Sequence, residues 1–270
     1  MKYTFRRKLS FAFLISIFML TQSLQTLSAK GNELDAPLMK GKNILIVYGG
    51  WPGHSPKEFV EKMQPWLEAE GAHVTLSDSL SIYTDVEFLK SQDLIIQAWT
   101  MGEITKPQRD GLLSAVKSGV GFAGCHGGTG DSFRNTVEFQ YLVGCQWVAH
   151  PGGQIDYTVE ISKEKDDVTK GLADFKVHSE QYYVLVDPNI KVLATTTFNG
   201  DTDEWIDGAV IPVAWKKYFA KGRVFYYSVG HNMNDYDIPE SWSIVQRGFR
   251  WASESKYQPV EDWLRPVYKE

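Results

Sequence analysis

Cysteine is scarce in this chain, which has only Cys125 and Cys145 among its 270 residues. Residues 132–145 are predicted to form a helix, which would hold the two thiols at its opposite ends. A regular helix of that length separates its ends by about 20 Å. A disulfide bond cannot bridge that distance, so we expect both cysteines to be free.

The apolar run nearest the N-terminus, residues 9–20, is too short to cross a membrane. A basic stretch precedes it, and Ala29 offers a small residue at a cleavage position. This pattern is typical of a secretory signal peptide, predicted over residues 1–29. A lipoprotein anchor would need a cysteine near the cleavage position, and there is none. We therefore expect a periplasmic or secreted protein with no membrane attachment after cleavage. Arg6 and Arg7 leave general secretory and twin-arginine export both open.

Positive charge is in deficit, with 28 basic against 33 acidic residues and a net charge of −5. Removing the four basic residues of the signal peptide leaves about −9, which disfavours nucleic acid and acidic membranes as partners. Internal repeats and low-complexity segments are also lacking. We therefore expect a leader over residues 30–42, one domain over 43–256 and a C-terminal tail over 257–270. The sequence indicates no oligomeric state.

Strand and helix patterns alternate through the first half of the domain. Apolar strands are predicted at residues 43–48, 73–76 and 93–99, and helices at 56–69 and 106–117. This alternation is typical of parallel strands joined by crossover helices. After Gly144 strands predominate, until a helix at 242–253. The fold class is therefore a three-layer, flavodoxin-like α/β fold with a mostly parallel sheet and added antiparallel strands in the C-terminal half. The further strands are expected at residues 154–162, 181–186, 191–197, 209–215 and 222–229.

The segment from Val120 to Gly128 is the most distinctive in the chain. A short apolar strand leads into a turn in which glycines stand on both sides of Cys125 and His126. Glycine allows a sharp turn with an exposed tip, and a strand, tight turn and helix in succession resemble a nucleophile elbow. Such a turn would raise His126 above the carboxyl edge of the sheet. Ligands of open α/β sheets bind at that edge, where the loops at 49–54, 100–103 and 125–128 should converge.

Five of the six histidines lie in loops or at predicted strand ends. His54 and His231 follow strands whose ends should face the same crevice as His126, and His150 precedes a proline. His178 and Glu180 lie two residues apart, which places both side chains on one face of an extended segment. The histidines with this strand-end placement are His54, His126, His150, His178 and His231.

Neutral imidazoles and a carboxylate can serve two kinds of chemistry. They bind zinc, manganese or another divalent ion with a position left open for substrate. Without a metal they act as general acid and base near neutral pH. We expect His126, His231 and Glu180 to be catalytic, and we leave a metal site open. Its candidate ligands are His54, His126, His178 and His231.

Tryptophans at predicted strand ends indicate a carbohydrate ligand. Trp51 and Trp99 lie in or beside loops of the expected crevice, and aromatic faces can stack on sugar C–H surfaces. Together with His54 and His150, they form the predicted substrate-binding set. Cys125 is less suitable as a nucleophile, because it lies one position before the expected tip and is typical of a small buried residue.

Several motifs, in order, resemble the ThuA-like (trehalose-utilisation) family over residues 43–253. The match rests on Gly53-His54-Ser55, Gly124-Cys125-His126-Gly127-Gly128, Gly144 with His150-Pro151, Glu180-Gln181-Tyr182, Pro212-Val213-Ala214-Trp215, and Lys221 to Tyr226 leading to Gly230-His231. The resemblance implies a fold similar to class I glutamine amidotransferases, with histidine where those enzymes place their cysteine. It also implies catabolism of trehalose-like disaccharides and their 3-keto derivatives.

Two positions depart from the family pattern. Asp167-Val168 stands where the family often has His-Pro, and Ser179 stands where it often has an aspartate before the glutamate. The second change keeps Glu180 and removes one carboxylate from the expected site.

These observations favour an exported protein that acts on a sugar or 3-keto-glycoside by acid–base chemistry, with or without a metal. Two alternatives remain: a non-catalytic sugar-binding protein that serves partner enzymes, and a metal-dependent hydrolase of intact glycosides. A glutamine amidotransferase is not expected.

Overall fold

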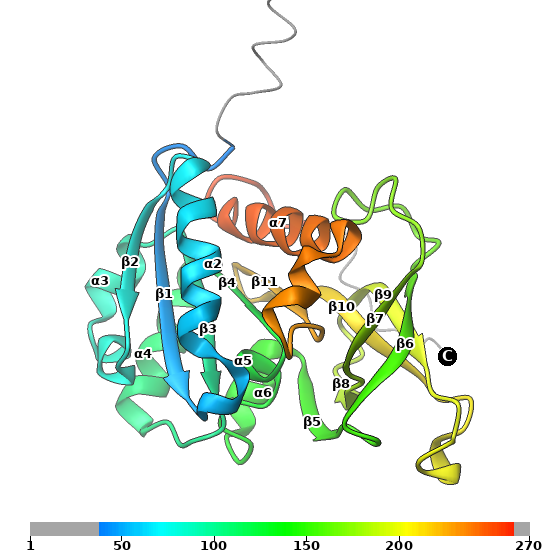
Figure 1. Cartoon of the computed structure of the whole chain (residues 1–270). Coiled ribbons are helices and arrows are strands. Elements are labelled where there is room, and N and C mark those ends of the chain that lie inside the picture. The colour runs from blue at the N-terminus through cyan, green and yellow to red at the C-terminus, as the bar shows by residue number, and fades with distance from the viewer. Residues whose placement is uncertain (1–37, 262–270) are drawn as a thin grey trace, which may run out of the picture. The chain divides into compact units, whose positions relative to one another are not determined.

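The computed structural model describes residues 38–261 of the chain (Figure 1). Contacts divide the chain into two compact units, residues 1–38 and 39–270, and the fold described here is the second. The predicted signal peptide, most of the leader and residues 262–270 of the tail lie outside the described residues. None of the helices between residues 38 and 261 is both long and apolar enough to cross a membrane.

A nine-stranded sheet forms the centre of the described fold, in the order β2-β1-β3-β4-β11-β10-β9-β6-β7. The first five strands pair in parallel, and from β11 onward each neighbour is antiparallel. The predicted mixed α/β fold is therefore confirmed. The strands are β1 (Asn43–Gly50), β2 (His73–Ser77), β3 (Leu94–Thr100), β4 (Gly121–Cys125), β6 (Gln154–Ile161), β7 (Phe175–Glu180), β9 (Lys191–Thr197), β10 (Val210–Phe219) and β11 (Gly222–Tyr227).

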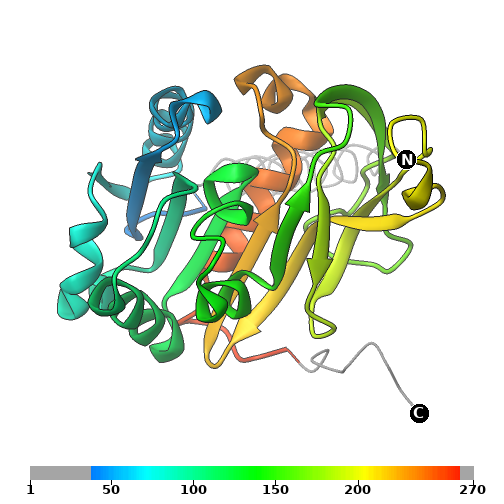
Figure 2. The same ribbon diagram turned by 90° about the horizontal axis from the view of Figure 1, so that it is seen from below.

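Helices cover both faces of the parallel half (Figures 1 and 2). One face packs on α2 (Pro56–Ala69) and α7 (Pro239–Ser253), and the other on α4 (Lys106–Ser118) and α6 (Val137–Val143). Neighbouring residues of β1 alternate between the two cores: Ile44 and Ile46 face α2 and α7, whereas Leu45 and Val47 face α4. A strand buried on both sides must be apolar at every position, which explains the continuous apolar runs of this half. Two shorter helices complete the set, α3 (Val86–Ser91) and α5 (Gly127–Gly130).

The predicted helix over residues 132–145 is wrong. The segment holds only α6, which ends where Gly144 adopts a left-handed φ of 89°. Cys145 then begins β5 (Cys145–Ala149), which pairs with β8 (Tyr183–Val186) in a separate two-stranded sheet. Both cysteines are nevertheless free, as predicted, and both are buried.

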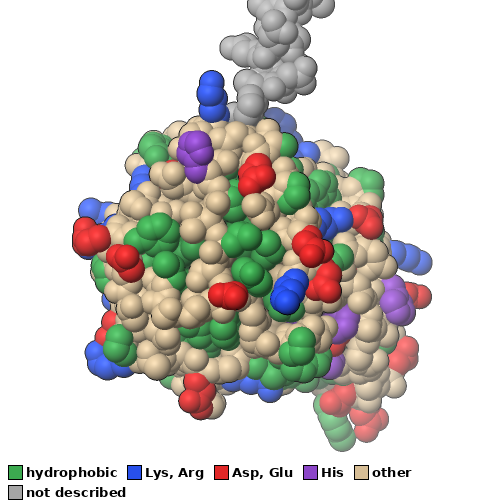
Figure 3. All heavy atoms as spheres, turned by 60° about the vertical axis from the view of Figure 1, so that its left-hand side comes forward, with side chains coloured by type: hydrophobic (Ala, Val, Ile, Leu, Met, Phe, Trp, Pro, Cys, Tyr) green, Lys and Arg blue, Asp and Glu red, His purple; other side chains and the backbone are tan. Residues whose placement is uncertain are grey.

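Charged side chains of both signs are dispersed among apolar and neutral surface over the face shown in Figure 3. That face carries no continuous basic stripe of described residues.

Candidate functional site

His126 stands at the tip of the turn after β4, with a left-handed φ of 45°. Its N–H donates to Tyr227 O (2.7 Å) on the neighbouring strand, and its carbonyl accepts from the Tyr226 hydroxyl (3.1 Å). The turn is closely packed, since a Cβ at Gly124 would collide with Thr129. A non-glycine residue is costly in this backbone conformation, and its surroundings hold the His126 ring in one place.

His54 reaches the same point from the loop after β1. It ends a short 3₁₀ turn, Pro52–His54, and the next residue, Ser55, has a left-handed φ of 47°. The His54 Nδ1 lies 3.0 Å from Thr100 Oγ1 at the end of β3. The convergence of loops from β1, β3 and β4 is the one expected for a parallel sheet.

The third and fourth groups come from the C-terminal half. Glu180 is the last residue of β7 at the far edge of the sheet, and His231 follows β11. The Glu180 carboxylate is nearly buried and lies between the histidines, with 3.1 Å from Oε2 to His126 Nε2, 3.5 Å from Oε2 to His54 Nε2, and 3.2 Å from Oε1 to His231 Nδ1. One ligand atom from each of the four side chains lies within 4.8 Å of the others. We call these four residues the histidine cluster.

The protons in the histidine cluster can be assigned from the hydrogen bonds of His126. Its Nδ1 lies 2.7 Å from the Ser228 carbonyl oxygen, which can only accept, so Nδ1 carries the hydrogen. Burial lowers the pKa of His126 to about 4, against the contact with Glu180, which raises it. At neutral pH the ring is therefore uncharged, and Nε2 presents a lone pair toward Glu180.

Glu180 presents lone pairs as well. Burial would raise the pKa of its carboxyl, but the contacts with His126, His231 and His54 outweigh burial and hold the pKa well below its usual range. An ionised carboxylate only accepts hydrogen bonds. His126 Nε2 and Glu180 Oε2 are thus two acceptors 3.1 Å apart, an arrangement that a cation between them would stabilise.

The donor set suits a divalent metal ion. Three imidazoles and one carboxylate are ligands of zinc and other first-row ions. The His231 Nδ1 is buried without a hydrogen-bond partner among the described residues, because its contact with Glu180 is not aligned for one. His126 donates its other ring hydrogen to a backbone carbonyl, and His54 Nδ1 contacts a threonine hydroxyl, which are the outer contacts that orient metal-binding histidines. The residues present therefore fit a divalent ion.

Tyr182 belongs to the site, although it was not among the predicted site residues. Its ring stacks on His126 with centroids 4.3 Å apart, and its hydroxyl lies 3.0 Å from His126 Nε2. Burial, with smaller effects of Glu180 and Asp131, raises the pKa of this phenol well above its ordinary value, so the hydroxyl keeps its hydrogen. The Glu180-Gln181-Tyr182 motif held the only sequence signal for this role.

The rim of the site carries two of the predicted substrate-binding residues. His150 lies 3.7 Å from Glu180 Oε1 through its Nε2, its side chain is 37% exposed, and its buried Nδ1 has no partner among the described residues. Trp51 is 44% exposed and meets His54 edge-on at 4.9 Å. A substrate can therefore approach the histidine cluster beside Trp51 and His150.

Two other predicted residues lie elsewhere. His178 is not part of the cluster: its side chain is 65% exposed and bonds Asp156 (2.7 Å). It shares a strand face with Glu180, but it lies two residues, about 7 Å, back from the converging loops, and Glu180 takes the fourth place instead. Trp99 packs against Gly49 and Gly102 within the wall formed by these loops.

Cys125 is buried behind His126 and is unsuited to nucleophilic catalysis. Burial raises the pKa of its thiol to about 12, although a contact with Tyr236 lowers it. The thiolate is the nucleophilic form, and it would be scarce at neutral pH.

Comparisons with known proteins agree with this architecture. A sequence model of the ThuA family, described as trehalose utilisation, matches residues 43–252. A putative ThuA-like protein from Bacteroides uniformis is 19% identical, with 78% of this chain and 91% of that chain covered at a TM-score of 0.67. One from Parabacteroides merdae is 16% identical, with 84% and 96% covered at 0.64. A cytoplasmic protein of Salmonella typhimurium is 13% identical, with 81% and 100% covered at 0.56. The comparison with curated proteins gave no match.

Proposed function

The chain belongs to the ThuA family of trehalose utilisation, and from this premise we propose that it is an exported, metal-dependent enzyme of carbohydrate breakdown. Its substrate is a sugar or 3-keto-glycoside such as an oxidised trehalose-like disaccharide. The observation that carries the proposal is the convergence of His54, His126, His231 and Glu180, in which the Nε2 of a neutral His126 and the carboxylate of Glu180 face each other as two acceptors.

A divalent ion held by these four side chains would supply a Lewis acid for a carbonyl or hydroxyl oxygen of the sugar. Zinc and manganese both suit the donor set. Ser228 and Thr100 orient His126 and His54, so the ligand atoms are placed before substrate arrives. Preorganised groups of this kind stabilise developing charge without reorganising during the reaction.

His150 and Tyr182 are placed to handle protons and substrate oxygens. His150 lies beside Glu180 and reaches solvent, so it can take a proton from a substrate C–H bond and pass it to water. A ketone acidifies the C–H bonds next to it, which makes proton removal by an imidazole feasible and permits loss of the glycosidic oxygen. Tyr182 keeps its hydrogen, and its hydroxyl lies 3.0 Å from His126 Nε2. If Nε2 held the ion, this hydroxyl would be free to donate to a substrate oxygen instead. Trp51 provides an apolar surface for the sugar ring at the rim.

Metal content tests the proposal directly. Protein purified without metal affinity resin should hold about one zinc or manganese per chain, and His126→Ala should hold almost none. His178→Ala is the matched control, because that histidine is exposed and lies outside the cluster. Circular dichroism would establish that each variant is folded. Folded wild-type protein that binds neither ion, even when either is supplied, would contradict the metal site.

Turnover separates an enzyme from a sugar-binding protein. We expect the metal-loaded protein to convert 3-keto-trehalose and His150→Ala to lose most of the rate while its affinity changes little. Binding without turnover would favour the non-catalytic alternative. Turnover of unoxidised trehalose at a similar rate would favour a hydrolase of intact glycosides.

Export is part of the proposal and rests on the N-terminal sequence. A basic stretch, a short apolar run and Ala29 match a cleavable signal peptide. N-terminal sequencing of the protein isolated from its native cells should begin near Lys30. An N-terminus that retains residues 1–29 in the cytoplasm would contradict export.

A further inference from the structure

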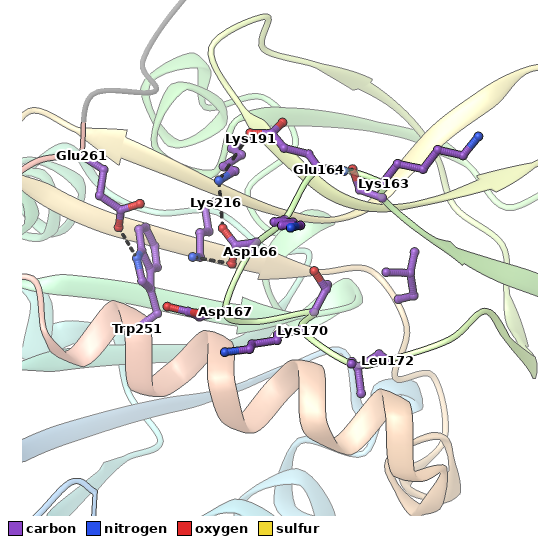
Figure 4. A pocket seen from close by; sticks show the side chains of 15 residues that line it. Lys163, Glu164, Asp166, Asp167, Lys170, Leu172, Lys191, Lys216, Trp251 and Glu261 are labelled. Atoms are coloured by element: carbon purple, nitrogen blue, oxygen red, sulfur yellow. Dashed lines mark hydrogen bonds and ion pairs between the residues drawn. The ribbon is translucent and has the colours of Figure 1, made fainter.

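A cavity of about 710 Å³ lies at the end of β6 and β7 that is remote from Glu180 (Figure 4). The loop joining these strands forms one wall, Lys191 and Lys216 line it from β9 and β10, and Trp251 and Glu261 complete it. The six residues of β7 separate this loop from Glu180, a distance of roughly 20 Å. A small molecule in the cavity would therefore not touch the histidine cluster.

A buried ion-pair network forms the base of the cavity. Asp166 lies between Lys216 (2.6 Å) and Lys191 (3.0 Å), as Figure 4 shows, and Glu164 lies 3.5 Å from Lys191. The Asp166 and Lys216 side chains are each 3% exposed. These charges already pair with one another, so they shape the cavity and do not themselves call for a ligand.

The rim differs from the base in having unpaired positive charge. Lys165 and Lys170 line the cavity, and neither has an ion-pair partner among residues 38–261. Five lysines and four carboxylates line the cavity in all, so the lining has an excess of one positive charge, whereas the whole chain carries a net charge of −5. A bound molecule with a negative group would balance it.

The remaining lining groups suit hydroxyls. Ser162, Thr169 and Asp167 face the same cavity, and they offer hydroxyl and carboxylate partners for hydrogen bonds. The volume lies in the range of small-molecule sites. We propose that this cavity is a second binding site, for an acidic saccharide whose carboxylate or phosphate contacts Lys165 and Lys170. The proposal goes beyond the reaction at the histidine cluster and does not depend on it.

Calorimetric titration of the whole mature chain tests the second site with three probes: glucuronate, glucose 6-phosphate and neutral glucose. We expect one or both acidic sugars to bind, with affinity that falls as salt rises, and glucose to bind at least about tenfold more weakly because it lacks the charge. Which acid binds more tightly identifies the negative group. Equal binding of glucose, or no binding of either acid at 0.15 M salt, would overturn the proposal.

Variants locate the binding within the molecule. The double variant Lys165→Gln/Lys170→Gln should weaken the acidic sugar by about tenfold or more, since each lost charge contact is worth about 1 kcal/mol or more. Lys176→Gln is the matched control, because Lys176 is an exposed lysine of the neighbouring strand β7 and does not line the cavity. His126→Ala should bind the acidic sugar as the wild type does. An unchanged affinity in the double variant, or an equal loss in Lys176→Gln, would exclude this cavity as the site.

Discussion

Two buried polar clusters lie at opposite ends of β6 and β7, and they differ in how their hydrogen-bond donors and acceptors are matched. Around Asp166 each carboxylate oxygen faces a lysine ammonium group, so donors and acceptors are matched. In the histidine cluster, an ionised Glu180 faces a neutral His126 that has already used its hydrogen on Ser228. The first cluster is complete as a structural element, whereas the second would be completed by the proposed cation.

The largest effect on the proposed metal site is expected from replacing Glu180 by glutamine. The amide is close in shape but carries no charge, so the cluster loses its only anionic ligand. We expect the bound metal to fall from about one per chain to less than about a tenth, with turnover lost in parallel. Elemental analysis measures the first and keto-sugar conversion the second. Retention of a full equivalent of metal in Glu180→Gln would show that the histidines suffice.

Removing the charge of Asp166 from the ion-pair network should lower the free energy of unfolding and leave metal binding unchanged. In Asp166→Asn, Lys216 remains as a buried charge without its partner, and loss of such a partner costs about 3–5 kcal/mol. Denaturant unfolding measures this change, and metal content should stay at the wild-type level. A change below about 1 kcal/mol would show that Lys216 finds water in the adjoining cavity.

The same cluster predicts a pH dependence. Burial would raise the pKa of Asp166, but Lys216, Val168 N–H and Lys191 outweigh burial, and the pKa is lowered. A carboxyl whose pKa is depressed by folding contributes stability above its unfolded pKa of about 4, and this contribution is lost as the pH falls through the folded value. Metal-free wild-type protein should therefore lose more stability between pH 5 and pH 3, measured by urea unfolding, than Asp166→Asn does. Parallel curves would contradict the assignment.

A smaller effect is expected from the group that orients His54. Thr100→Val keeps the shape of the side chain and removes the hydroxyl that contacts His54 Nδ1. Loss of an outer contact of this kind weakens metal binding by about 10- to 100-fold, which competition with a chelator would measure. Thr196→Val, at a buried threonine that contacts Gln181, is the matched control and should leave the affinity unchanged.

The smallest effect should come from the rim. Trp51→Ala removes a half-exposed ring and leaves the four cluster residues in place. We expect KM for the sugar to rise by up to about tenfold, in line with about 0.5–1.5 kcal/mol for an aromatic contact, with kcat nearly unchanged. A large fall in kcat with KM constant would instead indicate that Trp51 positions His54.

The two halves of the molecule also differ in how far the sequence predicts them. Strands buried on both faces, such as β1 and β3, show as continuous apolar runs. The carboxyl ends of such strands meet at one edge, which is why His54 and His126 could be expected to lie together. Glycines around His126 marked the turn itself.

The antiparallel half offered weaker signals. β7 alternates apolar and polar residues only over its first four positions, and nothing local indicates that its last residue meets loops from the other side of the sheet. The sequence could identify Glu180 as a candidate site residue. It could not show that Glu180, and not His178, is the fourth member of the histidine cluster. The short β5 was not predicted, and its first residue, Cys145, was assigned to the predicted helix because only Gly144 separates the strand from α6. Long-range strand pairing determines both the position of Glu180 and the formation of β5.

The four cluster residues come from the loop after β1, the loop after β4, the end of β7 and the loop after β11. They are drawn from the beginning, middle and end of the domain sequence, so no partly folded fragment possesses the full set. An ion that binds this set favours the native state alone and raises its free energy of unfolding by mass action. It would therefore stabilise the association of the early and late parts of the chain, and unfolding of the domain would release it.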